Sequence, residues 1–525
     1  MSEKSAAGGF FPIEQDMLEW LTRHRVTGYL LVNAALLIAV VIMATLDHAP
    51  LGRAAYVVAM IALCSAPLLL LETINGRFAL LAIFMLLYFC FFGLLDLLTL
   101  LFGGLFPPVA ALDFMSTAEI GILIGGVAAV AGYAVGATLG RTSRTADPAT
   151  DWPRRTVLVM GMLLWSVGTA AIIYYQVFVA PEKSNVSVKH GLEQMGPMLT
   201  FVVMLGNLVQ PLGVLILAYG YARFRSLTWQ ALIIAVVVAQ IGVGFVTDIK
   251  GVAVVGGVLV IVVKTLLDNK LPKAWLAGGA LFVIFVFPVF QAYRAEVSGE
   301  RGLNREQALQ NISKMISLAI ASRDKVMDPE RAERSQNFVE RLSSKGNVEL
   351  IFARVGVDVP QLGGQSLVAI PLAFVPRLLM PDKPDAPVGQ MFAKVFLKSD
   401  SDVYISLSYL GELYWNFGWA GVLGGMTFYG LLLGVIGARS DLSQSISVTR
   451  LLVLAATAQG LCMGFGGGLA TSSVSWMRSL AAIGILHLLL ARKRSGVPEP
   501  ESRAAPERAP LIPVPSIARF PNVLR

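Results

Sequence analysis

Charged residues are scarce in this chain. Asp, Glu, Lys and Arg make up 14% of its 525 residues, while 55% are hydrophobic; a soluble domain is usually about one-quarter charged. Apolar runs of roughly 18 or more residues recur along the whole sequence, and each is long enough to cross a hydrocarbon core of about 30 Å as a helix. This composition excludes an ordinary soluble protein and predicts an all-α, polytopic membrane protein.

Cysteine and histidine are also rare. The three cysteines, Cys64, Cys90 and Cys462, all fall within apolar runs, so we expect small buried side chains rather than a disulfide framework or a zinc site. The four histidines are scattered without the spacing of metal ligands. We therefore predict no metal site and no cofactor.

The apolar runs predict about twelve transmembrane helices. They lie at residues 27–46, 53–71, 78–101, 116–139, 157–179, 197–221, 228–247, 251–267, 274–290, 416–438, 451–470 and 477–491. The first run follows a polar start, so we interpret it as a span and not as a cleavable signal. When these spans alternate, the short loops rich in Lys and Arg all fall on one side, which is then the cytoplasmic side. These loops account for the net charge of +8, so we predict no nucleic-acid partner.

This topology divides the chain into five parts and places both termini in the cytoplasm. The parts are a cytoplasmic N-terminal segment (1–26), the first nine spans (27–290), a large periplasmic loop (291–406), the last three spans (407–494) and a proline-rich, disordered cytoplasmic tail (495–525). A loop of that length is usually functional. We expect helices in its first part and extended or re-entrant chain in "VPQLGGQSLVAIPLAFVPRLLMPDKPDAP".

Ionisable and polar residues gather at the predicted outer ends of the spans. Glu412 is the most conspicuous, because an acid beside a long apolar run is a functional-site hypothesis by default. The others are Asp96, Glu119, Asp248, Lys250, Arg294, Arg377, Asp382, Lys383, Tyr414, Asn416 and Arg478. This distribution predicts a cationic chamber at the outer boundary of the membrane.

Such a chamber suits a lipid that carries phosphate or diphosphate at headgroup level. The arginine guanidinium binds phosphate oxygens in a bidentate manner and stays charged at any working pH. In a cavity of low dielectric, the cations would stabilise negative charge on a departing diphosphate. One carboxylate opposite them would act as general base on a hydroxyl nucleophile, and we predict Glu412 first and Asp248 second for that role.

Structural interpretations of the same residues remain open. Glu412 also fits an acid at a helix N-terminus, with Tyr414 in an interfacial aromatic belt. Arg294 and Arg478 also fit interfacial residues whose stems lie along apolar surface. Asp248 and Lys250 fit a local ion pair in a tight turn, and Asp96 and Glu119 fit bonds to neighbouring helices.

The second half of the chain resembles a known family. "FVPRLLMPDKP" followed by "GELYWNFGWAGVLGG" resembles the signature of bacterial oligosaccharide repeat-unit polymerases, the Wzy-type O-antigen and exopolysaccharide polymerases. "FPVFQAYRAE" and "TDIKG" also look like parts of that pattern. Met380 departs from it, because the family often has an aromatic residue there.

The resemblance implies an inner-membrane enzyme with a glycosyltransferase C-like fold. It would join undecaprenyl-diphosphate-linked repeat units at the periplasmic face, without nucleotide sugar or metal. Its partners would be those lipid-linked glycans and membrane lipids, with a chain-length regulator and a flippase beside it. The residues that bind substrate would be Arg294, Arg377, Lys383, Lys250, Tyr414, Asn416 and Arg478.

Two other functions remain open. An O-antigen ligase would use the same donor, but such ligases are expected to carry a histidine in the large loop, and residues 291–406 contain none. A lipid-linked glycan transporter would show internal repeats and charges near the membrane midplane. The charges here lie near span ends, which favours the polymerase.

Overall fold

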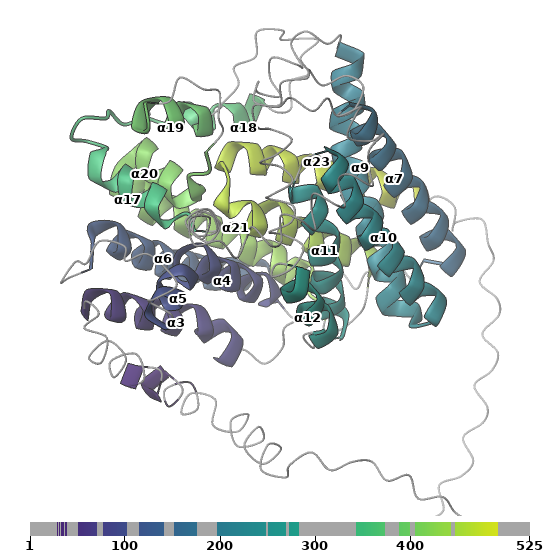
Figure 1. Ribbon diagram of the computed structural model, residues 1–525, viewed down its shortest axis with the longest axis horizontal. Coiled ribbons are helices and arrows are strands. Elements are labelled where there is room, and N and C mark those ends of the chain that lie inside the picture. Colours follow the sequence, from purple (N-terminus) through teal and green to yellow (C-terminus); the bar gives the residue numbers. More distant parts are fainter. Residues whose placement is uncertain are drawn as a thin grey trace, which may run out of the picture. The chain divides into compact units, whose positions relative to one another are not determined.

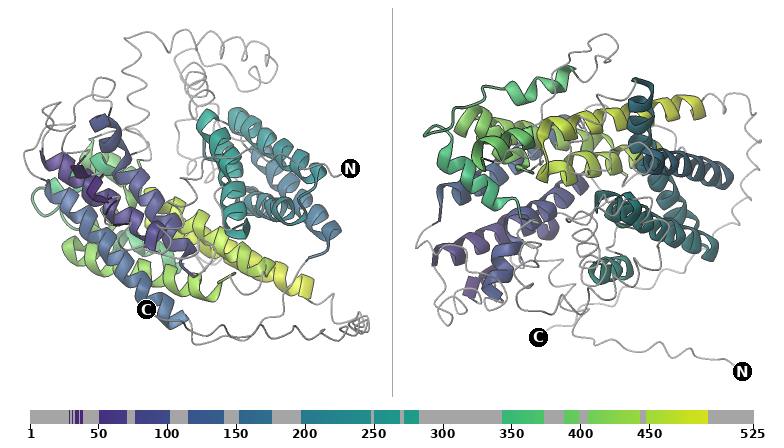
Figure 2. Two further views of the ribbon diagram at one scale, coloured as in Figure 1. Left: turned by 90° about the horizontal axis from the view of Figure 1, so that it is seen from below. Right: turned by 45° about the horizontal axis from the view of Figure 1, so that its top comes forward.

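The computed structural model shows the protein as a set of α-helices. Figures 1 and 2 draw its described part as coiled ribbons joined by chain, and that part contains no β-strand beyond an isolated bridge between Val355 and Val359. The described residues are several positions between 29 and 38 and the ranges 51–70, 77–101, 115–140, 152–175, 197–247, 250–268, 272–282, 343–372, 388–398, 405–442 and 447–491.

The helices fall into an N-terminal, a middle and a C-terminal series. The first holds α3 (Leu51–Leu70), α4 (Ala79–Phe92), α5 (Leu94–Leu101), α6 (Thr117–Leu139) and α7 (Arg154–Tyr174). The second holds α9 (Pro197–Phe224), α10 (Leu227–Thr247), α11 (Lys250–Asp268), α12 (Lys273–Leu281), α17 (Lys345–Arg354), η4 (Gln365–Leu367), α18 (Ala369–Leu372) and α19 (Val388–Phe396). The third holds α20 (Ser408–Ala420), η5 (Gly421–Gly425), α21 (Met426–Arg439), α22 (Val448–Thr457), η6 (Ala458–Cys462), η7 (Met463–Gly466) and α23 (Leu469–Ala491). The described end of α23, from Gly484 to Ala491, belongs to a second unit of the chain.

Among the described residues, seven helical stretches are long and apolar enough to cross a membrane, or eight when the bent pair α4 and α5 counts as one span. They coincide with the predicted spans 78–101, 116–139, 157–179, 197–221, 228–247, 416–438, 451–470 and 477–491. The prediction of an all-α, multi-pass membrane protein is confirmed. Twelve as the number of spans stays a prediction. Residues 27–46 lie largely outside the described residues and 274–290 about half outside them. The helices at the predicted spans 53–71 and 251–267 are described but are not among those long and apolar enough to cross a membrane.

Glycines let two pairs of these helices approach each other closely. Helix α6 packs against α21, and a methyl group added at Gly132 would clash with the backbone carbonyl of Thr427 on α21. Helix α7 packs against α9 in the same way, since a methyl group at Gly168 would lie 2.6 Å from the backbone nitrogen of Gln210. Membrane helices usually associate through such small residues.

Several helix ends that the sequence assigns to one membrane face contact one another. Arg225, which follows α9, is 2.7 Å from Asp268 at the end of α11. Arg154 at the start of α7 donates a hydrogen bond of 3.4 Å to Ser226, before α10. Trp275 of α12 donates one of 3.1 Å to Tyr221 on α9. These contacts agree with the prediction that the loops before α7, after α9 and after α11 lie on the same face of the membrane.

The helix that carries Glu412 starts earlier than predicted and is broken. It begins at Ser408 rather than at 416, because α17 covers its first turns with protein and polar residues there need not face lipid. Gly418 then adopts φ 59°, a conformation that favours glycine, and the π-helical turn η5 follows. The break separates α20 from the apolar helix α21.

Helices α17, α19 and α20 form a small group of their own, visible as neighbouring green ribbons in Figure 1. Their shared apolar core consists of Ile351, Val355, Val359, Val388, Phe392, Phe396, Leu407 and Trp415. Two of these helices belong to the predicted periplasmic loop, so part of that loop is packed directly against the helix of Glu412.

Candidate functional site

Glu412 lies completely buried on α20, with 0% of its surface exposed. One carboxylate oxygen accepts a hydrogen bond of 2.7 Å from the Ser366 hydroxyl. The other accepts one of 2.6 Å from the backbone N–H of Leu469, the first residue of α23. Both oxygens are therefore hydrogen-bonded, as burial of a carboxyl group requires.

Asn416, one helical turn after Glu412, completes this polar group. Its side-chain nitrogen donates to the Ser366 hydroxyl at 2.8 Å and to the Glu412 backbone carbonyl at 2.7 Å. Its side-chain oxygen accepts from the Gly364 N–H at 3.0 Å. Gly363 and Gly364 have φ values of 59° and 93°, so the "GGQS" turn needs glycines to bring its backbone against α20.

Tyr414 points to the other side of α20, toward α17. Its ring stacks on that of Phe352 with 3.7 Å between centroids and 14° between planes. Trp419 meets both rings edge-on, at 6.0 Å from Tyr414 and 5.6 Å from Phe352. Tyr414 is half-buried and Trp419 is 38% exposed, so the protein covers this aromatic group only in part.

The remaining predicted site residues are not brought to this group within the described part of the chain. Arg478 lies inside α23, well past its start, and is exposed. Lys250 is the first residue of α11, and its side chain is outside the described part. Asp248, Arg294, Arg377 and Lys383 lie outside the described residues, and their roles stay predictions.

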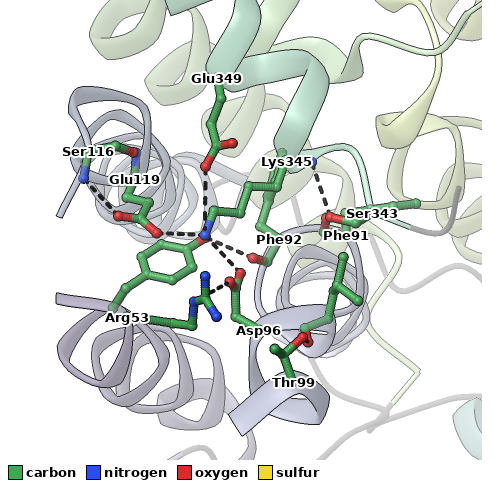
Figure 3. Close-up of polar contacts among 12 residues, drawn as sticks. Arg53, Phe91, Phe92, Asp96, Thr99, Ser116, Glu119, Ser343, Lys345 and Glu349 are labelled. Carbon is green, nitrogen blue, oxygen red and sulfur yellow. Dashed lines mark hydrogen bonds and ion pairs between the residues drawn. The ribbon is translucent and has the colours of Figure 1, made fainter. Parts of the chain in front are cut away.

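A second polar group, which the sequence does not reveal as a unit, surrounds Lys345 at the start of α17. Its ammonium nitrogen lies 2.9 Å from a carboxylate oxygen of Asp96 on α5 and 2.6 Å from one of Glu119 on α6. Figure 3 shows both carboxylates pointing toward the lysine from two different helices. All three residues are buried, with 2–7% of their surface exposed. Asp96 and Glu119 therefore bond to neighbouring helices, as the structural interpretation predicted, and their shared partner Lys345 belongs to a helix of the predicted loop.

Further groups complete the surroundings of Lys345. Arg53 of α3 lies 3.8 Å from Asp96, and Glu349 lies 3.8 Å from Lys345, one turn along α17. The Tyr56 ring is 4.3 Å from the ammonium group. Burial lowers the pKa of Lys345, but the charges and hydrogen bonds of Asp96 and Glu119 outweigh it and raise the pKa overall. Lys345 thus stays charged at neutral pH.

Two local features position these groups. Glu119 stands in the first turn of α6 within a capping box: its carboxylate accepts from the Ser116 N–H at 2.8 Å, and the Glu119 N–H donates to the Ser116 hydroxyl at 3.1 Å. This motif is readable in sequence as S-x-x-E. The backbone N–H of Ser344 donates to the Phe91 carbonyl at 3.0 Å, which fixes the start of α17 beside α4.

No set of three metal-ligating side chains is found among the described residues. The carboxylates around Lys345 are paired with cations, and that of Glu412 is hydrogen-bonded to a hydroxyl and an N–H.

Comparison with known proteins assigns no family. The chain has no significant match among protein-family models, curated proteins or solved structures.

Proposed function

We propose that this protein polymerises lipid-linked oligosaccharides at the outer face of a bacterial inner membrane. In detail, it has about twelve spans, both termini in the cytoplasm, and undecaprenyl-diphosphate-linked repeat units as donor and acceptor. The proposal rests on the sequence resemblance and on the chemistry of the residues that carry it.

The observation that supports it most is the hydrogen-bonded group of Glu412, Ser366 and Asn416. Ser366 stands in the loop shortly before the segment of Arg377 and Lys383. Its bonds to Glu412 and Asn416 join the part of the loop that precedes that segment to the helix on which the predicted base lies. Direct contact thus links the predicted loop to the "GELYWNFGWAGVLGG" stretch of the resemblance, while "FVPRLLMPDKP" lies outside the described residues.

The reaction assigns one task to each kind of residue. A hydroxyl of the acceptor glycan attacks the anomeric carbon of the donor glycan, a C–O bond forms, and the bond to the diphosphate breaks. Glu412 accepts the hydroxyl proton, for which it must exchange one hydrogen bond for the substrate. Arg294, Arg377 and Lys383 bind the negative charge that the diphosphate carries away. Tyr414 and Asn416 shape the acceptor site.

A transporter of lipid-linked glycans is the second candidate, because one observation favours it. The helical stretch Ser408–Arg439 is broken at Gly418, and the N-terminus of α23 points its first N–H at a buried carboxylate. Interrupted helices whose ends meet polar groups are typical of transporter sites. Here the interruption lies beside the loop-covered α20 rather than in a repeated element, so the polymerase is the better account.

The test is the length of surface polysaccharide in cells that carry single variants. Arg294→Ala and Arg377→Ala should abolish long chains, and Glu412→Gln should reduce chain synthesis by about 10²–10⁴-fold, as loss of a general base does. Lys394→Ala, at an exposed loop lysine on α19, is the control and should leave chain length unchanged.

Membrane protein level and thermal stability must be measured for each variant. Glu412→Gln keeps an acceptor for the Leu469 N–H, and its amide NH2 can donate to the Ser366 hydroxyl oxygen in place of the bond that this hydroxyl now donates, so its fold should survive. Normal chains from both arginine variants would contradict the diphosphate role. Normal chains from Glu412→Gln would make that residue structural.

A further inference from the structure

We propose that Lys345 is a positioning residue: its ion pairs with Asp96 and Glu119 hold helix α17 in place, and α17 in turn sets the position of Tyr414 in the acceptor site. The inference rests on the proposed function for the role of Tyr414. The ion pairs of Lys345 with Asp96 and Glu119, which we call the anchor, do not depend on that role.

Lys345 is almost completely buried. Its side chain is 8% exposed and reaches carboxylates on two different helices at 2.9 and 2.6 Å. A lysine is almost never buried unless paired, and three charged groups so close together depend on one another. If Lys345 lost its charge, Asp96 and Glu119 would remain as buried carboxylates without their main partner, a state that is strongly disfavoured.

Helix α17 connects Lys345 to Tyr414 through Phe352. Lys345 begins the helix, and Phe352 lies on the same face two turns later. A methyl group at Gly121, two residues after Glu119 on α6, would clash with the Phe352 ring. Phe352 therefore fills a space that glycine leaves open on α6, and its other face stacks on Tyr414 at 3.7 Å.

Helix α17 also contacts α20, the helix that carries the predicted base Glu412. A methyl group at Gly411 would lie 2.9 Å from Ile351, so α17 and α20 are in close contact immediately before Glu412. Asn347 also donates a hydrogen bond of 2.7 Å to the Ser406 carbonyl, ahead of α20. Helix α17 thus packs against both α6 and α20. The ion pairs of Lys345 fix its N-terminal end (Figure 3).

Three variants separate this role from general damage. Lys345→Met keeps most of the apolar stem and removes the charge. Lys345→Met with Asp96→Asn and Glu119→Gln removes all three charges together, and glutamine at 119 still fits the capping box. Lys394→Met removes an exposed loop lysine on α19 and is the matched control.

The first measurement is amide hydrogen exchange of the full-length protein in lipid nanodiscs. Lys345→Met should speed exchange at least tenfold over Lys345–Arg354, with α21 unchanged. Lys394→Met should match the wild type. The triple variant lacks the ion pairs but leaves neither Asp96 nor Glu119 as a buried carboxylate without a partner, so its exchange over α17 should lie between that of Lys345→Met and that of the wild type. Wild-type exchange over α17 in Lys345→Met would overturn the anchor, whatever the activity of the protein.

The second measurement is polymerisation kinetics with lipid-linked repeat units as the probe. Lys345→Met should raise the apparent KM for acceptor by up to about 10²-fold, the loss that a small misplacement causes, and the triple variant should restore it in part. Faster exchange over α17 with unchanged kinetics would overturn the positioning role. A wild-type protein without polymerase activity would contradict the proposed function, and with it the role assigned to Tyr414. The exchange result would still show whether the ion pairs of Lys345 hold α17 in place.

Discussion

Glu412 and Lys345 face the same physical problem, an ionisable side chain removed from water, and solve it differently. In the described part of the chain, both carboxylate oxygens of Glu412 accept hydrogen bonds from neutral donors, the Ser366 hydroxyl and the Leu469 N–H. Lys345 is matched by carboxylates. A base that must accept a proton suits neutral surroundings, whereas a residue that only holds a helix benefits from a strong ion pair. The two environments thus agree with the two roles proposed.

Glu349 adds an acid to the Lys345 group that the cations do not fully stabilise. Burial raises its pKa, and the attraction of Lys345 only partly offsets the rise. The folded protein therefore favours the protonated form of Glu349 more than the unfolded chain does. Its contribution to stability is complete at pH values below the ordinary pKa of a glutamate and is lost as the pH rises through the raised pKa.

We expect Glu349→Gln to stabilise the protein at neutral pH by less than about 1 kcal/mol, because the side chain is 34% exposed and partly screened by solvent. Thermal unfolding in detergent at several pH values between 4 and 7 measures this. The Tm advantage of the variant should grow as the pH rises. An advantage that shrinks with rising pH would show that Lys345 stabilises the Glu349 carboxylate more than burial disfavours it.

Sequence patterns could predict part of the site residue by residue. Glu412 and Asn416 stand out because polar groups beside an apolar run are costly. Lys345 does not, because "SSKGN" reads as an exposed turn and its partners Asp96 and Glu119 lie far away in the chain. The available signal was indirect: two acids at span ends require a cation, and only tertiary structure shows which one supplies it.

At the scale of helices, small residues decide which elements meet. The periodic apolar runs could predict that α6 and α21 exist, but they could not pair them, since the two are far apart in sequence. The glycine spacing carries that information: Gly132 and Gly136 on α6 face Thr427 and Leu431 on α21. The start of α20 was predicted too late because the cover provided by α17 is a tertiary effect.

Gly132→Ala should destabilise the protein by about 1–3 kcal/mol, the usual cost of forcing an extra carbon into a packed contact. The added methyl group meets the Thr427 backbone, which cannot rotate away as a side chain can. Gly242→Ala in α10, where a methyl group meets nothing within 4 Å, is the control. Thermal unfolding in detergent compares them, and equal Tm values for the two variants would contradict the proposed packing.

At the scale of the whole molecule, the described part is a multi-pass helical protein with segments of a large loop seated on its helix ends. Arg53, Asp96 and Glu119 come from three helix ends that the topology assigns to the outer face, and Lys345 comes from the loop assigned to the same face. Their contact is what the predicted alternation of spans requires. Composition and charge bias could predict this arrangement because both follow from the cost of placing charge in hydrocarbon.

The central claim is that this single chain joins lipid-linked repeat units. The most direct measurement is polymer formation by the purified wild-type protein, reconstituted in liposomes with undecaprenyl-diphosphate-linked repeat units and without nucleotide sugar. We predict ladders of glycan that lengthen by one repeat unit, and their loss in Arg377→Ala. Substrate that remains at one repeat unit, although the protein is folded and correctly inserted, would contradict the account.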